Sequence, residues 1–409
     1  MIKKVPVTEL RLGMFIHDLN IGWMAHAFLR NRFMLKREED LRTIQESGVV
    51  EVYIDTLKGL DLVGAPTQAE AEASIFREMV QAAERMVSPL QHTSFREEVV
   101  LARAIHREAT EVVSGLLQDA RSGRPMQVER AEPLVDGLTE SLLRNPGVMI
   151  SLCRLKERDA YTFQHSVSVS ALMVLFSTGL ELPRELYLQV GMAGLLHDTG
   201  KMTIPDEILN KPDKLTDAEY EVMKGHVANG NAILEATPGI GETAIRVAAE
   251  HHERVAGTGY PGSLRGRAIS QEGRMAAIAD VYDALTSDRV YHRGLPPSQA
   301  LAKMFEWSRD HFDRRLMQRF IRTLGVYPAG SLVRLDSQCL AVVVEQGERD
   351  LMTPSVRIFY DIPRGTFVAP RDVDLATPES GGDAILSWED PAEWNVDPMA
   401  VLLGEGRGG

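Results

Sequence analysis

The chain has 409 residues, which is too long for one ordinary domain and indicates two or three. Hydrophobic residues make up 44% and charged residues 25%, the balance of a folded globular protein rather than a disordered one. The net charge of −13 argues against binding along a DNA or RNA backbone, which needs a basic surface. We therefore expect no DNA or RNA partner, and any phosphate ligand must find its positive charge locally.

A membrane-spanning helix is not expected. The most apolar run, residues 167–180, is broken by serines and shorter than the ~18 apolar residues that a span requires. The N-terminus begins with Met1 and carries Lys3 and Lys4, but no apolar signal core follows. We expect a cytoplasmic protein without membrane insertion.

Residues 1–66 predict a small α/β domain. Short strand-like runs surround one helix-like run, with strands expected at 5–7, 14–16 and 49–54 and the helix at 38–46. Gly64 and Pro66 indicate a linker at the end of this domain.

Residues 67–145 predict a helical linker rich in Ala, Glu, Arg and Leu. Its apolar residues recur at helical spacing, as in Ile75, Met79, Ala82, Ala83 and Met86. Two interpretations fit this pattern: a helical hairpin that packs on its neighbours, or a signalling helix that forms a homodimer.

Residues 146–328 predict an all-α domain, and residues 329–409 a β-rich C-terminal extension with a flexible tail. The expected helices are 161–179, 184–196, 216–235, 240–252, 270–288, 296–311 and 313–324. Thr216 followed by Glu219 forms a capping box that defines one helix start. The expected strands of the extension are 331–335, 340–345 and 356–360. The fold class is therefore multidomain, with the all-α domain between an α/β unit and a β-rich segment.

The histidines are unevenly placed, because five of the eleven lie between residues 165 and 252. Two aspartates, one of them adjacent to a histidine, complete a set of candidate metal ligands. This set is His165, His197, Asp198, His226, His251, His252 and Asp280. Imidazole with carboxylate suits Fe, Mn or Zn better than Ca or Mg. Seven ligands exceed the four of a structural zinc site, so we predict two ions bridged by Asp198.

A single histidine at a helix end is more often an ordinary polar residue than a ligand. The adjacent pair His251–His252 and the sequence His-Asp-Thr-Gly-Lys at 197–201 favour the metal interpretation. A zinc-protease HExxH motif is excluded, because the residue four positions after His252 is Ala256.

These motifs resemble the HD-GYP subset of the HD superfamily. The matching segments are 197–201 (HDTGK), 204–206 with Leu209, 211–212, 215–216, His226, 251–253 (HHE), 257–261 (GTGYP) and 280–287 (DVYDALTS). The resemblance covers residues 150–328. Residues 1 to about 130 more loosely resemble the small domain of unknown role that often precedes HD-GYP domains.

The resemblance implies an all-helical phosphodiesterase domain that hydrolyses cyclic di-GMP to pGpG and/or GMP by attack of a metal-bridging hydroxide. By analogy, His165, His197 and Asp280 complete one metal, His226, His251 and His252 the other, and Asp198 bridges. Two divalent transition metal ions are expected, with Fe or Mn preferred and Zn permitted.

Further site residues are also implied. Lys201 is expected to clamp a phosphate oxygen, and Asp283 to orient a ligand, take a proton or act only as a structural cap. Arg289, Arg293 and Tyr260 are the remaining candidates for substrate binding.

The sequence departs from the family pattern at four points. Tyr161 stands where members with a third metal carry Glu, which favours two metals here. Ala256 stands where the GYP loop usually has Asp. The loss of this carboxylate affects either the internal hydrogen bonding of the loop or a contact with a partner. Val227 stands where the family usually has Pro. His292 stands where the family often has a basic residue, whose place Arg293 would take.

Two other functions stay open. A protein that keeps its metals but turns over slowly would act as a cyclic di-GMP receptor, and a general HD phosphohydrolase would act on another nucleotide. The GYP loop argues against the second, and in the family it has been linked to proteins of the diguanylate cyclase type.

Overall fold

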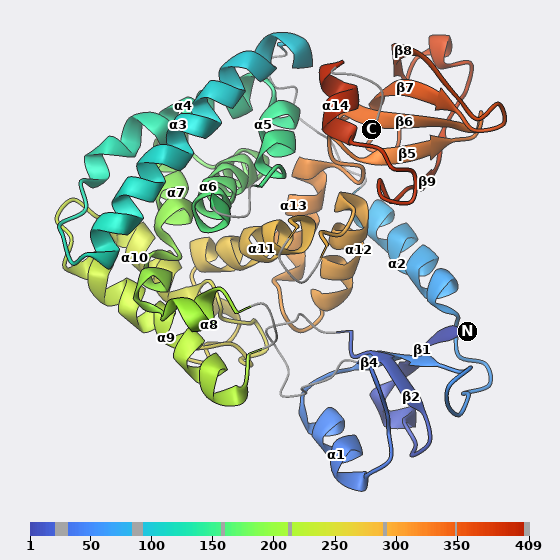
Figure 1. Cartoon of the computed structure of the whole chain (residues 1–409), viewed down its shortest axis with the longest axis horizontal. Coiled ribbons are helices and arrows are strands. Elements are labelled where there is room, and N and C mark those ends of the chain that lie inside the picture. The colour runs from blue at the N-terminus through green and yellow to red at the C-terminus, as the bar shows by residue number, and fades with distance from the viewer. Residues whose placement is uncertain are drawn as a thin grey trace. The chain divides into compact units, whose positions relative to one another are not determined.

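The computed structural model describes residues 1–20, 32–83, 93–156, 160–211, 215–288, 293–347 and 350–404 (Figure 1). The chain forms two compact units, one of residues 1–78 with the short segment 214–220, and one of the remaining residues. The predicted order of a small α/β region, a helical region and a β-rich C-terminal region is confirmed.

The first unit contains a four-stranded antiparallel sheet of order β1-β4-β2-β3, with helix α1 between β3 and β4 in the chain. Its elements are β1 (Ile2–Pro6), β2 (Phe15–Asp18), β3 (Phe33–Met34), α1 (Glu38–Glu46) and β4 (Glu51–Asp55). Val5 pairs with Val52 and Ile16 with Ile54, and all four side chains are fully buried. The sequence prediction of a helix at 38–46 coincides with α1.

Between residues 68 and 324, the described structure is mostly helical. Its helices are α2 (Gln68–Ala83), α3 (Phe95–Arg121), α4 (Glu132–Arg144), α5 (Pro146–Cys153), α6 (Tyr161–Gly179), α7 (Glu185–Leu196), α8 (Asp206–Leu209), α9 (Asp217–Glu235), α10 (Glu242–Glu250), α11 (Gln271–Thr286), α12 (Pro297–Trp307) and α13 (Arg314–Leu324). The seven helices predicted between residues 161 and 324 are present, with ends that differ by a few residues. The capping box of Thr216 and Glu219 begins α9 as predicted.

Helix α6 is the central helix of the second unit. It packs against α3, α4, α5, α7, α11 and α13, and its side chains are buried on almost every side. Such burial is compatible with its serines, because Ser168 and Ser177 donate hydrogen bonds to the carbonyls of Gln164 and Met173 in the preceding turn. His165 lies in the first turn of this helix and is therefore held rigidly inside the unit.

Helix α7 lies unusually close to α6 because glycines face the contact. A Cβ on Gly194 would lie 2.9 Å from the Cα atom of Ser170, so no larger residue fits without separating the helices. This close approach brings His197, which follows α7, beside His165, with their ring centroids 5.2 Å apart.

The C-terminal region forms a five-stranded antiparallel sheet of order β8-β7-β6-β5-β9. Its elements are β5 (Leu332–Leu335), β6 (Cys339–Glu345), β7 (Ser355–Asp361), β8 (Thr366–Asp374) and β9 (Ile385–Trp388), and α14 (Pro398–Leu403) follows. The sequence analysis predicted β5, β6 and β7. It did not assign β8, β9 or α14. Strand β8 gives no sequence signal, because most of its side chains are exposed and show no apolar alternation.

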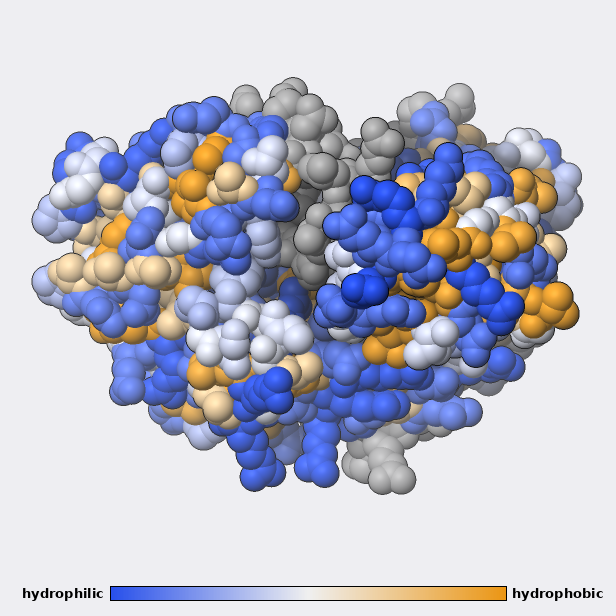
Figure 2. Space-filling model, turned by 90° about the horizontal axis from the view of Figure 1, so that it is seen from below, coloured by the Kyte–Doolittle hydropathy of each residue, from blue (hydrophilic) through white to orange (hydrophobic). Residues whose placement is uncertain are grey.

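Within the described residues, no helix is both long and apolar enough to cross a membrane. Figure 2 shows one face of the molecule, on which hydrophilic surface predominates and hydrophobic surface occurs in separate groups.

Gly200 is a strict packing requirement of the fold. A Cβ at this position would lie 1.9 Å from the carbonyl oxygen of His226 and 2.5 Å from the nitrogen of Gly230 in α9. We predict that Gly200→Ala lowers the free energy of unfolding by about 3 kcal/mol or more, because backbone on both sides must move. Chemical denaturation measures this change.

Gly115→Ala in α3 is the matched control, since its Cβ would meet nothing within 4 Å. It should raise the free energy of unfolding by roughly 1 kcal/mol through helix propensity. Equal effects of the two substitutions would contradict the packing account.

Candidate metal centre

The seven predicted ligands come together inside the second unit, and all are buried. Their donor atoms form two groups, Asp198 with His226, His251 and His252, and His165 with His197 and Asp280; within each, the donor atoms lie within 4.8 Å of one another. They come from five parts of the chain: His165 from α6, His197 and Asp198 from the end of α7, His226 from α9, His251 and His252 from the end of α10, and Asp280 from α11.

The imidazole rings are held by hydrogen bonds from Nδ1. His197, His226 and His251 donate from Nδ1 to the carbonyl oxygens of Gly194, Met223 and Ala248, at 2.8, 2.6 and 3.0 Å. Each carbonyl lies three residues before its histidine, so the ends and turns of the helices orient the rings. Because Nδ1 carries the proton, Nε2 has a lone pair for a metal.

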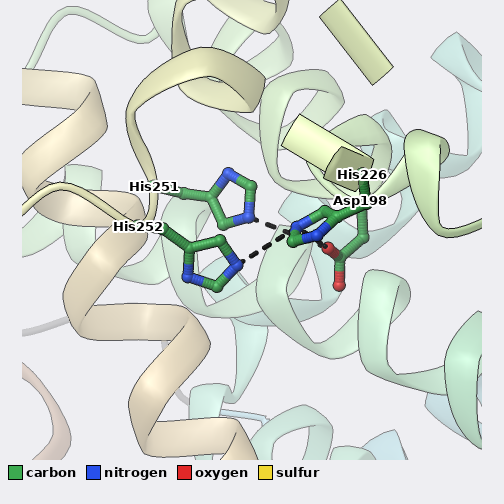
Figure 3. Close-up of side chains that lie close together, drawn as sticks. All are labelled: Asp198, His226, His251 and His252. Atoms are coloured by element: carbon green, nitrogen blue, oxygen red, sulfur yellow. Dashed lines mark hydrogen bonds and ion pairs between the residues drawn. The ribbon is translucent and has the colours of Figure 1, made fainter. Parts of the chain in front are cut away.

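Asp198 lies between the two groups. Its Oδ2 is 3.4 Å from Nε2 of His165 and 3.2 Å from Nε2 of His197. Its Oδ1 faces the other group, at 3.5 Å from Nε2 of His226 and 3.7 Å from Nε2 of His251. Figure 3 shows Asp198 and the three imidazoles of that group directed toward one another. One carboxylate is therefore placed to contact two ions.

The residues fit metal ions because several donor atoms are otherwise unsatisfied. Among the described residues, Nε2 of His197, Nε2 of His251, Oδ1 of Asp198 and Oδ2 of Asp280 are buried without a hydrogen-bond partner. Nε2 of His226, whose Nδ1 donates to Met223, lies only 3.2 Å from Nε2 of His252. Buried polar atoms without partners are costly, and cations bound between them would remove that cost.

The two groups differ in protonation. Burial lowers the pKa of His226 to about 4 and holds the pKa of His252 well below its usual value, so both rings are neutral at pH 7. Burial also opposes a charge on His165, but the carboxylates of Asp198, Asp280 and Asp283 outweigh it and raise its pKa to about 9. Without metal, a proton therefore occupies the His165 group.

Lys201 and Asp283, the other predicted catalytic residues, lie next to the ligands. The Lys201 ammonium contacts Oδ2 of Asp198, and its side chain is partly exposed. Asp283 lies one turn after Asp280 in α11 and accepts a hydrogen bond from Nδ1 of His165 at 2.6 Å. Of the roles foreseen for Asp283, this geometry fits the orientation of a ligand.

Tyr260 of the GYP loop lies against the centre. Its ring stacks on that of His252, with centroids 4.7 Å apart, and the Lys224 ammonium is 5.8 Å from the Tyr260 centroid. The aromatic ring therefore covers one ligand and carries a lysine at its outer side.

Glu253, rather than residue 256, organises the GYP loop. Its buried carboxylate accepts hydrogen bonds from the backbone nitrogens of Gly262 and Leu264, at 2.6 and 2.9 Å. Ala256 contributes only its backbone, which donates to the carbonyl of Asp310 at 3.1 Å. The loop keeps internal hydrogen bonds despite the replaced aspartate.

The two predicted substrate-binding arginines have different outcomes. Arg289 lies outside the described residues. Arg293 is largely exposed and lies 3.6 Å from Asp390 of the C-terminal region, and none of its described contacts reaches a candidate ligand.

Comparisons with known proteins agree with this geometry. An HD domain model matches residues 149–316, which include all seven candidate ligands, and a model for a domain of unknown function (DUF3391) matches residues 2–131. The cyclic di-GMP phosphodiesterase PA4108 of Pseudomonas aeruginosa is 41% identical over 412 aligned residues, covering 100% of this chain and 98% of the relative. This chain belongs to the HD-GYP family.

More distant relatives match part of this HD-GYP protein. The 3'3'-cGAMP-specific phosphodiesterase 3 of Vibrio cholerae is 32% identical over 219 residues, covering 53% of this chain and 46% of the relative. The solved structure of Bd1817, an HDGYP protein from Bdellovibrio bacteriovorus, is 16% identical, covers 78% of this chain and 98% of its own, and has a TM-score of 0.47.

Sequence reasoning on this HD-GYP protein missed Lys156 and the role of Glu253. The Lys156 ammonium contacts Asp283, 127 positions away, and donates a hydrogen bond to Oγ of Ser287 at 2.8 Å. No local pattern marks such a contact. Glu253 stood within a recognised motif, but the backbone nitrogens that it accepts follow nine and eleven residues later.

We predict that metal uptake by this HD-GYP protein releases a proton from His165 and none from His226 or His252. Between pH 6 and 8, the ion bound by the His165 group displaces the proton of that imidazole, so its affinity rises by up to about tenfold per pH unit. The ion bound by the His226 group displaces no proton from His226 or His252, because burial lowers the pKa of both rings and keeps them neutral. Calorimetric titration of metal-free protein with Mn²⁺, in buffers of different ionisation enthalpy, measures the affinity for each ion and the number of protons that its binding releases. Two ions with the same proton release would contradict the assignment.

Proposed function

We propose that this protein is a metal-dependent phosphodiesterase that hydrolyses cyclic di-GMP. The observation that carries the proposal is the convergence of seven buried ligands into two groups that share the Asp198 carboxylate. The full-length relative named as a cyclic di-GMP phosphodiesterase supports the substrate.

His165, His197 and Asp280 would hold one ion, His226, His251 and His252 the other, and Asp198 both. Bound divalent ions would supply Lewis-acid chemistry, which lowers the pKa of water and neutralises charge on phosphoryl oxygens. The mixed nitrogen and oxygen donors favour Fe or Mn and permit Zn. Tyr161 in place of the third-metal Glu supports two ions rather than three.

Lys201 would bind a non-bridging phosphate oxygen. Its ammonium now contacts Asp198, whose negative charge the two ions would neutralise, and its partly exposed side chain reaches from the ligands toward solvent. Transfer of this contact from Asp198 to the substrate would place one positive charge where the phosphate carries negative charge. Tyr260, stacked on His252 and with the Lys224 ammonium 5.8 Å from its ring, would contact the nucleotide beside the metal ligands.

A second nucleotide substrate is favoured by one finding. A relative that matches 53% of the chain is named as specific for 3'3'-cGAMP, a cyclic dinucleotide with one adenine. The metal ligands would contact the phosphodiester, which both nucleotides share. Other residues must therefore distinguish guanine from adenine.

The proposal extends to location and partners. We place the enzyme in the cytoplasm and expect the GYP loop to contact proteins of the diguanylate cyclase type. Residues 261–263 of that loop are exposed, which leaves them accessible to a partner. A homodimer through the helical region stays a proposal.

Turnover tests the proposal directly. Protein purified without oxygen should hydrolyse cyclic di-GMP, with pGpG and GMP separated by chromatography, and should contain about two ions per chain. We predict that Asp198→Asn lowers the turnover rate at least about a thousandfold and lowers the metal content, because both ions lose a shared anionic ligand.

Asp206→Asn is the control, since this carboxylate lies eight residues further on, is exposed and pairs with Arg121. It should keep wild-type turnover and metal content. Parallel assays with 3'3'-cGAMP identify the preferred nucleotide. If the protein holds two ions and binds cyclic di-GMP tightly but does not hydrolyse it, the protein is a cyclic di-GMP receptor and not an enzyme.

A further inference from the structure

A buried lysine adjoins the metal centre without belonging to either ligand group. Lys156 lies between α5 and α6, and its side chain is only 1% exposed. Its ammonium contacts Oδ2 of Asp283, donates to Oγ of Ser287 at 2.8 Å, and lies 5.6 Å from the centroid of the Tyr161 ring. A lysine is rarely buried unless it is paired, so a specific role is expected.

Lys156 and His165 share one carboxylate oxygen. Oδ2 of Asp283 contacts the ammonium of Lys156 and also accepts from Nδ1 of His165 at 2.6 Å. The Nε2 atom of the same ring faces Asp280, with Oδ1 3.1 Å away, and Asp198. Lys156, Asp283, His165 and the His165 metal group therefore form one continuous chain of contacts.

The rings around this chain restrict it further. Tyr161 stacks on His165 at an interplanar angle of 7°, with centroids 6.0 Å apart. Lys156 lies near the same Tyr161 ring, so the lysine and His165 both contact this tyrosine. Oδ2 of Asp283 is held by two contacts, one from Lys156 and one from His165.

We propose that Lys156 is a positioning residue of the metal centre, which holds Asp283 so that His165 presents Nε2 to an ion, and whose ammonium keeps a third divalent cation away from Asp283. Asp283 is the buried carboxylate of this cluster that lies in neither ligand group. Its charge is balanced by the buried Lys156, whereas Asp198 and Asp280 belong to the two ligand groups that would hold the ions.

A partly buried histidine lies near Lys156. Burial, followed by the positive charge of Lys156, lowers the pKa of His106 in α3 to about 4. A neutral imidazole next to the ammonium adds no second positive charge to this pocket.

The inference rests on the proposed metal centre but not on its substrate, so metal binding tests it without turnover. Metal-free, full-length protein would be titrated with Co²⁺, read by visible absorption and by metal analysis after gel filtration. The variants are Lys156→Met, Asp283→Asn and the double variant. Wild type should bind two ions and no third.

We expect each single variant to bind one of the two ions with wild-type affinity and the other about 10- to 100-fold more weakly, because His165 loses its orientation. Lys156→Met keeps the Asp283 carboxylate without the ammonium, so it should in addition take up a third ion. The double variant should be no weaker than Asp283→Asn alone, since Lys156 acts through Asp283. If Lys156→Met fails to fold, Asp283→Asn and the double variant carry the same comparison.

Lys4→Met is the matched control, because Lys4 is another buried lysine and pairs with Glu51 at 2.8 Å in the first unit. It should bind both ions as wild type does, whatever its stability. If Asp283→Asn and the double variant bind both ions with wild-type affinity, the ion pair of Lys156 and Asp283 has only a structural role. A third ion in wild type, or no third ion in folded Lys156→Met, would overturn the exclusion, and a wild type that binds no ion would overturn the metal centre itself.

Discussion

The structure of this site depends on one carboxylate that faces two groups of imidazoles. Asp198 directs one oxygen toward His165 and His197 and the other toward His226 and His251. Five buried histidines around one buried carboxylate would be unfavourable without cations, since several of their donor atoms have no other described partner. The helices that carry these residues thus bring together buried donor atoms whose unmet interactions bound cations would satisfy.

The packing of the helices explains how this convergence is reached. Gly194 lets α7 touch α6, and Gly200 lets the turn after α7 touch α9, so Asp198 lies between ligands from both neighbours. Backbone carbonyls at the ends and turns of the helices then orient the rings. Rigid elements supply the precision, and side-chain contacts such as the one between Asp283 and His165 complete it.

Much of this could be predicted from the sequence, because the signals are local. The helix at 161–179 begins and ends where apolar residues and glycine indicate, and the motifs at 197–201 and 251–252 bring ligand pairs together through adjacency alone. Strand β8 escaped prediction, since its exposed side chains show no alternation and its pairing with β7 defines it. Lys156 escaped because its partner Asp283 is distant in sequence, and the role of Glu253 depends on backbone nitrogens of a folded loop. Contacts of this kind exist only after the chain has folded.

The most direct test of the metal centre is a crystal structure of the protein grown with Mn²⁺, with anomalous diffraction measured for that element. The account predicts two anomalous peaks about 3.5–4 Å apart. One should lie among His165, His197 and Asp280, the other among His226, His251 and His252, with one oxygen of Asp198 toward each. A single peak, or peaks away from Asp198, would contradict it.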